Sequence, residues 1–487
     1  MLLAAVDLGS NSFRLEIGSV EGAQILRHNY WKEMVRLAGG MDDNKRLSRK
    51  SIETACECLA RMNERMRGMP GEQVRAVGTE TLRVAANVDT FLLEAQHALG
   101  FPIEVISGRE EARLIFEGCM HTVPRSEKRR LVVDVGGAST EVIVGRGFIA
   151  DNAESFRTGC VSASMRFFRN GTIDRNAFRQ AIVAASAEIE EAIDVFSRSN
   201  WDEAFGSSGT VDAASEILRA ENWTDGTITL EGLQKLRQAL LVAGDAKRIK
   251  LAGMKPERQD VMAGGTAVLI AVFETLGISE MRPARGALRL GVLYDLLGRR
   301  ESRDLRDASV DRLQTRFAVD RAQAQRVARI AQRIFGSLQP HAADADAKHL
   351  AWACALHEVG FAISHSDYHK HGAYLVANAD VAGFSTSEQE RLAELVLGQR
   401  GNLKKIGAAL ADPVRAATVL ALRLAVILCH ARRNVELPRL ELRGTRNGVD
   451  LSIDRTWLGA HPLTQHLLEE ESAQWERAGS RLVVHAL

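Results

Sequence analysis

The stretch LVVDVGGASTEVIVG at residues 131–145 repeats the pattern of AAVDLGSNSFRLEIG at residues 4–18, at a constant offset of 127 positions. The offset aligns Asp7 with Asp134, and the glycines and serines that follow them also match. Each stretch has an apolar strand that ends in an aspartate, a turn of small and hydroxyl-bearing residues, and a second apolar strand. A hairpin made twice predicts two similar α/β lobes, and ligands favour the cleft between such lobes.

The turns of the two hairpins suit an anion. Backbone N–H groups in a turn of small residues approach an anion closely, and neighbouring hydroxyls add donors. One such turn is weak evidence, because tight hairpins use the same residues for steric reasons. Two turns that each follow an aspartate indicate more, since carboxylates repel phosphate unless a hard cation such as Mg²⁺ bridges them. The pair therefore predicts a clamp for a phosphate chain and its metal.

The length of 487 residues exceeds what one hydrophobic core can hold, so several domains are expected. Alternating strand and helix patterns predict one α/β lobe at residues 1–123 and a second at 124–300. Residues 301–435 have an almost entirely helical pattern. Residues 436–487 are expected to form a small α+β domain, in which the Asn447-Gly448 pair predicts a β-hairpin.

Composition excludes some classes of function. Lys and Arg number 63 against 62 Asp and Glu, so no overall charge favours nucleic acid or an anionic membrane. The longest apolar run, residues 416–431, contains Arg423 and is too short to span a bilayer. No secretory signal is visible, and the six cysteines are scattered without metal-ligand spacing. We therefore expect a cytoplasmic protein with reduced thiols, without a transmembrane segment or a specific nucleic-acid partner.

The duplicated plan resembles the actin, sugar kinase and Hsp70 superfamily. Within it, the chain resembles the exopolyphosphatase/guanosine pentaphosphate phosphohydrolase (Ppx/GppA) family over essentially its whole length. The blocks that carry the resemblance occur in the family's order: AAVDLGSNSFRL, GTETLR (78–83), ISGREEARLIFEG (106–118), LVVDVGGASTE, GSSGT (206–210) and RGALRLGVLYDL (285–296). The implied fold is α/β: two actin-like (ribonuclease H-like) lobes with an interlobe cleft, an all-α HD-like domain and a small α+β domain.

One position departs from the family pattern. Ala138 stands where the family usually has a third glycine. We expect the alanine to be harmless if its φ angle is negative, and it leaves the following Ser139 in place.

Two adjacent glutamates are candidates for the catalytic base that the resemblance implies. Ser107 lies three residues before Glu110, which fits a capping box: Ser107 caps a helix and Glu110 reaches back to the Ser107 N–H. Glu110 therefore has a structural interpretation. Glu111 has none, and the resemblance assigns to this second glutamate the activation of the attacking water. A solvated carboxylate at a helix start is the alternative for Glu111.

The resemblance also assigns the metal and phosphate ligands. It makes Asp134 and Glu141 the Mg²⁺ contacts, with Asp7 supporting the metal through water, and it allows a monovalent cation such as K⁺. Arg83 matches a family arginine near the phosphates. The turn residues expected to bind phosphate are Gly9, Ser10, Asn11, Ser12, Gly136, Gly137, Ser139 and Thr140, joined by Gly206, Ser207, Gly209 and Thr210 from a further strand-to-helix turn.

The leading hypothesis is a Mg²⁺-dependent exopolyphosphatase that removes terminal orthophosphate from inorganic polyphosphate. The alternative enzyme converts guanosine pentaphosphate to tetraphosphate with the same residues. A non-catalytic nucleotide-sensing regulator is disfavoured because Glu111, Asp134 and Glu141 are all present. The stretch AGGTAVLIAVFETLG (263–277) occupies roughly the place of the superfamily's adenosine motif, which leaves a nucleotide open. The resemblance suggests a homodimer.

The helical part resembles HD-domain phosphohydrolases, but its metal ligands are incomplete. CALHEVG (354–360) has Glu358 where that core has aspartate, and the expected first histidine and closing aspartate fall on Gln323 and Val426. We therefore expect a degenerate metal site. The stretch from Arg299 to Arg333 contains ten arginines and five acidic residues. These are interpreted as solvated helix faces or as a basic wall that steers long polyphosphate.

Overall fold

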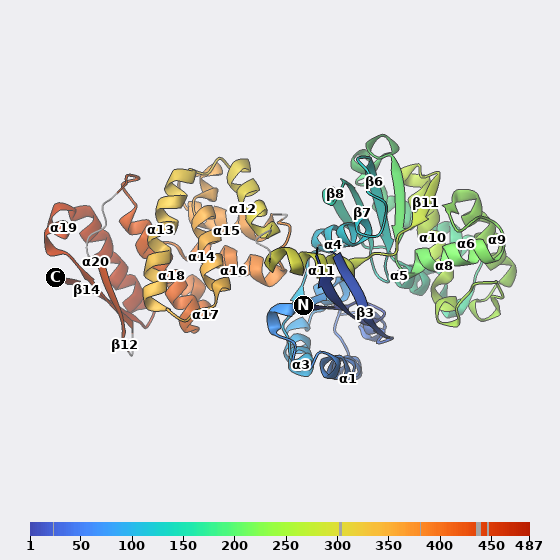
Figure 1. Ribbon diagram of the computed structural model, residues 1–487, viewed down its shortest axis with the longest axis horizontal. Helices are drawn as coiled ribbons and strands as arrows, with labels where there is room; N and C mark the ends of the chain where they lie inside the picture. Colours follow the sequence, from blue (N-terminus) through green and yellow to red (C-terminus); the bar gives the residue numbers. More distant parts are fainter. Residues whose placement is uncertain (23, 301–303, 380, 435–439, 446–447) are drawn as a thin grey trace. The chain divides into compact units, whose positions relative to one another are not determined.

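The computed structural model describes residues 1–487 except 23, 301–303, 380, 435–439 and 446–447, and for Arg300 the backbone alone. The chain divides into two compact units, Met1–Asp304 and Leu305–Leu487 (Figure 1). The first unit contains two lobes, each built on its own sheet. The second is helical and ends in a small sheet. The predicted fold class, two actin-like lobes followed by a helical region and a small α+β end, is confirmed.

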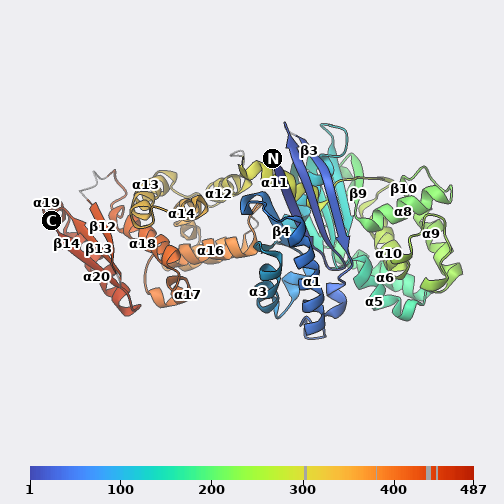
Figure 2. The same cartoon turned by 60° about the horizontal axis from the view of Figure 1, so that its bottom comes forward.

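The first lobe has a five-stranded sheet with the order β3-β2-β1-β4-β5. Its strands are β1 (Leu2–Leu8), β2 (Phe13–Glu21), β3 (Gln24–Glu33), β4 (Val74–Gly78) and β5 (Ile103–Val105). Strands β1, β4 and β5 are parallel, and the hairpin β1–β2 continues into β3. Figure 2 shows α1 (Arg49–Arg65) and α3 (Val88–Leu99) on one face of this sheet, where they share its apolar core.

The second lobe has a six-stranded sheet with the order β10-β11-β9-β6-β7-β8. Its strands are β6 (Arg129–Val135), β7 (Thr140–Arg146), β8 (Ile149–Phe156), β9 (Glu203–Ser207), β10 (Ile228–Thr229) and β11 (Glu280–Pro283). The covering helices are α5 (Cys160–Phe167), α6 (Arg175–Glu190), α7 (Ile193–Phe196), α8 (Gly209–Ala220), α9 (Leu230–Ala243) and α10 (Gln259–Leu276).

Helix α10 is the centre of the second lobe's core. Among the described residues, one helical segment, Pro256–Leu276, has the length and the apolar composition that crossing a membrane requires. Within the lobe, however, 72% of its most apolar window is buried, and it packs on α5, α6 and α9. A helix that is apolar all round is expected in the interior of a large domain.

Two helices join the lobes. Helix α4 (Gly108–Met120) packs on β7 and β8, and α11 (Leu288–Arg300) packs on β1 and on α4. One buried cluster holds Ala5 and Val77 of the first sheet, Val132 and Ile143 of the second, and apolar residues of both helices. The hairpin turns and the start of α4, which carries the two glutamates, are therefore positioned by a common core.

The second unit begins with seven α-helices in its described residues. They are α12 (Leu305–Arg316), α13 (Arg321–Leu338), α14 (Asp344–Leu356), α15 (Tyr368–Asn378), α16 (Thr386–Gly398), α17 (Gly407–Leu410) and α18 (Pro413–Leu428). The C-terminal sheet has the order β12-β13-β14, with β12 (Leu440–Thr445), β13 (Gly448–Ile453) and β14 (Arg481–Ala486).

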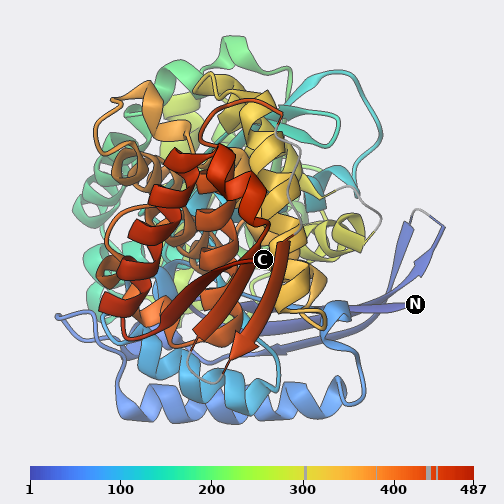
Figure 3. The ribbon, with the colours of Figure 1, turned by 90° about the vertical axis from the view of Figure 1, so that its left-hand side faces the viewer.

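The predicted C-terminal hairpin is present as the antiparallel pair β12–β13, although Asn447 itself lies outside the described residues. Figure 3 shows α20 (Pro462–Arg477) along this sheet, with the short α19 (Arg455–Ala460) before it. Arg423 of α18 is buried, and its Nη2 donates to Glu471 of α20 at 2.6 Å. A single apolar cluster joins the helices and the sheet.

Candidate active site

The two duplicated hairpins have the same local geometry. In β1–β2 Asp7 lies opposite Arg14, and in β6–β7 Asp134 lies opposite Glu141. A Cβ atom on Gly9 would lie 3.0 Å from the carbonyl oxygen of Ser12, and a Cβ on Gly136 would lie 3.0 Å from that of Ser139. Each turn therefore needs glycine at the same position, because the chain folds back tightly over it. The repetition seen in the sequence is a repetition of structure.

Both turns open into one cavity of about 110 Å³ within the first unit. The predicted residues that line it are Asp7, Gly9, Ser10, Asn11, Ser12, Glu111, Asp134, Gly136, Gly137, Ser139, Glu141, Gly209 and Thr210. Ala138 also lines it, and its φ angle is not in the left-handed region. The condition under which we expect an alanine to be harmless at this position is therefore met. We call this cavity the cleft.

Glu111 projects from the first turn of α4 into the cleft and is 8% exposed. Nη1 of Arg83 donates to its Oε2 at 2.8 Å. Burial raises the pKa of Glu111 to about 7; Arg83 lowers it, and Asp7 and Asp134 raise it further. A carboxylate that titrates near neutral pH can act as a general base without being permanently protonated.

Glu110 has a different structural role from the one predicted. Ser107 caps α4 by accepting the N–H of Glu110 at 3.1 Å, so half of the predicted capping box is present. The carboxylate of Glu110, however, accepts Nε and Nη2 of Arg113 at 2.8 Å each. Arg113 in turn donates to Asp295 of α11 at 2.7 Å. The capping-box prediction for this side chain is corrected: Glu110 belongs to a buried ion network that ties α4 to α11.

Asp134 and Glu141 are directly opposite in the β6–β7 ladder, so their side chains project from the same side of the sheet. Burial raises the pKa of Asp134 to about 6, while the neighbouring Ser207 side chain and the charge of Arg14 lower it. Burial, and then Glu111 and Asp134, hold the pKa of Glu141 well above its usual range. Ionising all of these carboxylates is costly unless a cation lies among them.

This donor set fits a hard divalent cation. Among the described residues, no three His, Cys, Asp or Glu side chains converge closely enough to hold an ion by themselves. Mg²⁺ does not need such a cage, because it is usually held by one or two carboxylates together with water and substrate phosphates. Asp134 and Glu141 are suited to this role. Nη1 of Arg289 donates to Oδ2 of Asp7 at 3.4 Å, so the guanidinium already balances part of the charge of Asp7.

Four of the predicted phosphate-binding residues do not line the cleft. Arg83 lies behind Glu111, where it also holds Glu80 (2.8 Å) and the carbonyl of Ile106 (2.9 Å). Thr140 and Ser207 donate their hydroxyls to the carbonyls of Thr158 and Gly286, and Gly206 faces Met281 and Val211. The structure therefore gives these side chains supporting positions around the site.

Arginine side chains that were not predicted from the sequence also reach the cleft. Arg14, Arg258 and Arg289 line it. A Cβ on Gly209 would lie 1.7 Å from Nη2 of Arg258, so this glycine makes room for the guanidinium. Arg14 could have been found from the sequence, because the hairpin register places it opposite Asp7. Arg258 stands alone before α10 and gave no such signal.

Further cations extend this group beyond the cleft. Burial, and then Arg14 and Arg258, lower the pKa of Lys32, with a smaller effect from Lys255. These four residues come from both lobes, and we call them the cationic rim. A rim of this kind would attract a chain of phosphates.

A second cavity, of about 490 Å³, adjoins the cleft and shares Ser10 and Asn11 with it. We call it the side cavity. Its other walls combine apolar and polar side chains: Met34, Val161, Met165, Phe168 and Val261, with Arg36, Ser164, Arg169, Asn170, Glu257 and Asp260. Within the described part of the chain, the buried Oγ of Ser164 has no hydrogen-bond partner. No sequence motif marked this cavity, because its residues are scattered over both lobes.

In the second unit, the HD-like residues are held by protein groups. His357 donates from Nδ1 to the carbonyl of Cys354 at 2.7 Å, and Gln323 donates to that of Cys429 at 3.0 Å. Both oxygens of Glu358 accept Arg432, at 2.6 and 3.0 Å. The guanidinium of Arg432 therefore balances the charge of the buried Glu358 carboxylate.

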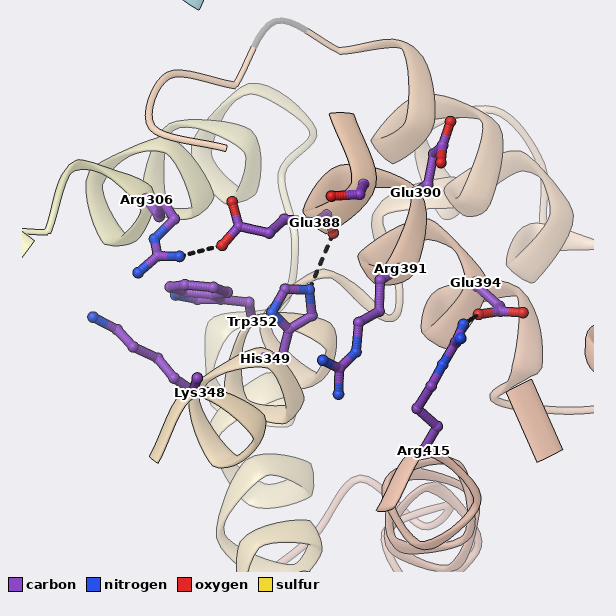
Figure 4. Close-up of a pocket in the computed structure, with 11 residues that line it drawn as sticks. Arg306, Lys348, His349, Trp352, Glu388, Glu390, Arg391, Glu394 and Arg415 are labelled. Carbon is purple, nitrogen blue, oxygen red and sulfur yellow. Dashed lines mark hydrogen bonds and ion pairs between the residues drawn. The ribbon is translucent and has the colours of Figure 1, made fainter. Parts of the chain in front are cut away.

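A cavity of about 680 Å³ in the same unit is also ion-paired (Figure 4). Arg306 and Lys348 lie near the ring of Trp352, at 4.8 and 5.4 Å from its centroid. Arg391 pairs with Asp346, and the remaining pairs are Arg306–Glu388, Arg415–Glu394 and Lys348–Asp307. Because each cation is balanced by an acid, the walls do not favour a simple anion. Arg306 belongs to the arginine-rich stretch for which solvated helix faces and a basic wall were both considered, and here it is paired with Glu388.

The fold and the cleft together define a protein of the actin-like class, with two duplicated hairpin turns lining a cavity in its first unit. The Ppx/GppA phosphatase family model matches residues 20–300, and the model of Ppx/GppA phosphatase domain III matches residues 305–472. The chain belongs to the Ppx/GppA phosphatase family.

Known relatives support this assignment. The chain is 37% identical over 488 residues to a guanosine-5'-triphosphate,3'-diphosphate pyrophosphatase of Aeromonas hydrophila subsp. hydrophila, an alignment that covers 98% of this chain and 97% of the relative. A solved Ppx/GppA enzyme of Aquifex aeolicus has a TM-score of 0.51 and 22% identity, over 60% of this chain and 99% of that one. A solved exopolyphosphatase of Cytophaga hutchinsonii has a TM-score of 0.55 and 23% identity, over 61% of this chain and 98% of that one. These two structures bear on the fold alone.

Proposed function

We propose that the protein is a phosphoanhydride hydrolase that removes the terminal 5'-phosphate of guanosine 5'-triphosphate 3'-diphosphate, the guanosine pentaphosphate considered above. The observation that carries the proposal is the side cavity beside the cleft. A substrate with a phosphate chain on one end and a nucleoside on the other would fill both cavities. The name of the Aeromonas relative supports the same substrate.

The chemistry of the side cavity favours a nucleoside over a bare phosphate chain. Apolar walls such as Phe168 and Met165 suit a flat base, and small-molecule sites usually combine such walls with a few polar groups. Glu257 and Asp260 would repel polyphosphate. Their carboxylates can instead accept hydrogen bonds from the N–H groups of a guanine edge, because an ionised carboxylate is an acceptor and not a donor. Polyphosphate could contact Arg36 and Arg169 in this cavity, but it would leave the apolar walls without a partner.

In the cleft, the chain's own residues can perform the hydrolysis. Arg83 holds Oε2 of Glu111, which leaves Oε1 to accept a proton from the attacking water. The small-residue turns after Asp7 and Asp134 present backbone N–H groups to the phosphoryl oxygens. Enzymatic phosphoryl transfer relies largely on positioning and charge stabilisation of this kind. Mg²⁺ held by Asp134 and Glu141 would neutralise charge on the phosphate oxygens.

Exopolyphosphatase activity is the second candidate function. The cationic rim would accept any chain of phosphates that enters the cleft, whatever lies at its far end. The same Glu111 would then release orthophosphate from the end of polyphosphate. The two activities differ in whether the side cavity contributes.

The test is phosphate release by the purified full-length protein with Mg²⁺. The proposal expects a kcat/KM for guanosine pentaphosphate at least tenfold above that for tripolyphosphate or long polyphosphate. A higher value for polyphosphate would reverse the order of the two functions. Absence of release from every substrate, with binding retained, would instead identify a nucleotide-sensing regulator. Glu111→Gln serves as the control for contaminating phosphatases.

A further inference from the structure

The loop that follows α16 brings two nitrogen donors together over an exposed glycine. Gly401 has a φ of +75°, and a Cβ atom there would lie 3.6 Å from Nζ of Lys405 and 3.9 Å from Nε2 of His369. Lys405 is in the short 3-10 helix Leu403–Ile406, and His369 is in the first turn of α15. Both donors therefore approach the same point, which a side chain at position 401 would occupy.

Each of these donors has capacity left for a ligand. Nζ of Lys405 donates one hydrogen bond to the carbonyl of Arg400 at 2.7 Å, and an ammonium has three N–H groups. His369 is 8% exposed, and its Nδ1 is buried without a partner among the described residues. A neutral imidazole that carries its proton on Nε2 would direct an N–H toward Gly401. The geometry thus provides N–H groups from two different elements.

A second buried polar atom in this region is also unsatisfied. Oε1 of Gln399 has no partner within the described residues, whereas its Nε2 donates to the carbonyl of His357 at 2.6 Å. Buried polar groups in native proteins are nearly always hydrogen-bonded, so orphaned ones need an explanation such as water or a ligand. Gln399 directly precedes the Arg400–Gly401 turn in the chain, and His369 approaches Gly401 through its Nε2.

The surroundings carry a surplus of positive charge. Burial, and then Arg423, Lys370 and Arg400, lower the pKa of Lys405 to about 8, while Asp367 opposes them. Burial, and then Lys405 and Arg400, lower the pKa of His369 to about 4. The nearby acids are engaged: Asp367 pairs with Lys370 at 3.0 Å, and Glu471 pairs with Arg423. An anion at this point would therefore relieve repulsion among the cations.

The geometry points to a binding site for a phosphoryl anion over Gly401, held by Nζ of Lys405 and by Nε2–H of His369, with the guanidinium of Arg400 beside it. One phosphoryl group can bridge the two donors, because charge-assisted hydrogen bonds extend about 2.8 Å on each side. Arg400 is exposed, and its Cζ lies 5.4 Å from the ring centroid of Tyr368. The ligand has two sources: free orthophosphate, or a phosphate within a longer polyphosphate chain. The site lies in the second unit and does not depend on the function proposed for the cleft.

Titration calorimetry on the full-length protein in EDTA tests the site, since hydrolysis in the cleft is then suppressed. Orthophosphate and long polyphosphate are titrated separately into the wild type, Lys405→Gln and Lys404→Gln. Lys404 is the matched control, because it is the neighbouring exposed lysine in the same 3-10 helix. We expect Lys405→Gln to remove one class of binding site or weaken it at least tenfold, and Lys404→Gln to leave binding within twofold of the wild type.

Thermal melting separates a ligand role from a structural one. Because the charge of Lys405 is disfavoured by its neighbours, Lys405→Gln should raise the melting temperature of the free protein at pH 7. The same variant should lose the additional stabilisation that the anion gives. A Lys405→Gln variant that melts lower than the wild type and still gains the same stabilisation from the anion would assign Lys405 a structural role and overturn the proposal.

The two anions distinguish the sources. If orthophosphate binds with the Lys405 dependence described, the site takes free phosphate. If long polyphosphate alone shows that dependence, the site holds a phosphate within a chain. Three results would contradict a specific site. The wild type and Lys405→Gln could bind both anions equally well, or neither anion could bind. Alternatively, Lys405→Gln and Lys404→Gln could lose affinity equally.

Discussion

Nη1 of Arg83 donates to Oε2 of Glu111 at 2.8 Å, although Arg83 itself does not line the cleft. The arginine comes from α2 (Glu80–Val84) and the glutamate from α4, so the bond links two segments of the first lobe. It fixes one carboxylate oxygen and lowers the pKa of Glu111 against the opposing effect of burial. Arg83 is therefore a positioning residue for the candidate base.

Arg83→Gln should move the pH dependence of hydrolysis. Without the guanidinium, the pKa of Glu111 rises above about 7. The base is active when deprotonated, so the rising limb of the kcat/KM profile should shift to higher pH by roughly one unit. Arg109→Gln, on the exposed side of the same helix, is the matched control and should not shift it. An unchanged limb in Arg83→Gln would contradict the link between the two residues.

The two neighbouring glutamates should behave differently. Glu111→Gln keeps the shape of the side chain but cannot accept a proton, so kcat should fall by about 10²–10⁴-fold while the fold is retained. Glu110→Gln removes a charge from the buried network of Arg113 and Asp295. Its expected effect is a loss of about 1–3 kcal/mol in the free energy of unfolding. Steady-state kinetics and chemical denaturation measure both; an equal loss of kcat in the two variants would refute this division of roles.

The cleft carboxylates should make the protein less stable as the pH rises. The folded pKa values of Glu111 (about 7) and Asp134 (about 6) are raised, so the folded state binds more protons than the unfolded state between roughly pH 4 and 7. Glu141 has a raised pKa as well. Its neutral replacement, Glu141→Gln, should therefore raise the melting temperature by a few degrees at pH 8 and much less at pH 5.

The control for this prediction is Glu190→Gln, an exposed position on α6. It should change the melting temperature little at either pH. Mg²⁺ should stabilise the wild type more at pH 8 than at pH 5, because the carboxylates that would hold it are then ionised. A stabilisation by Glu141→Gln that is the same at both pH values would show that charge repulsion in the cleft is not its cause.

The sequence predicted those parts of the site that depend on local pattern. The hairpins around Gly9 and Gly136 could be recognised because backbone crowding imposes the same residues on both copies. Ser107 was correctly placed as a helix cap. The ion network of Glu110 could not be predicted, because its partner Asp295 is brought in by the packing of α11 on α4.

The parts of the site made by tertiary contacts were missed. Arg258 reaches the cleft from the start of α10, and the side cavity combines Met34 of the first lobe with Phe168 and Asp260 of the second. Neither has a periodic or spaced motif. The arginines between 299 and 333 form a dense sequence pattern, but their partners could not be predicted from it: Arg306 pairs with Glu388 and Arg321 with Asp311.

The central claim is that the cleft and the side cavity together select a guanosine substrate. Its most direct test compares the wild type with Asp260→Asn. The quantity measured is the ratio of kcat/KM for guanosine pentaphosphate to kcat/KM for tripolyphosphate. Replacing this carboxylate of the side cavity removes an acceptor for the base but leaves the cleft residues in place. The account predicts that the ratio falls at least tenfold, through loss of activity on the nucleotide alone. An unchanged ratio, or an equal loss on both substrates, would contradict it.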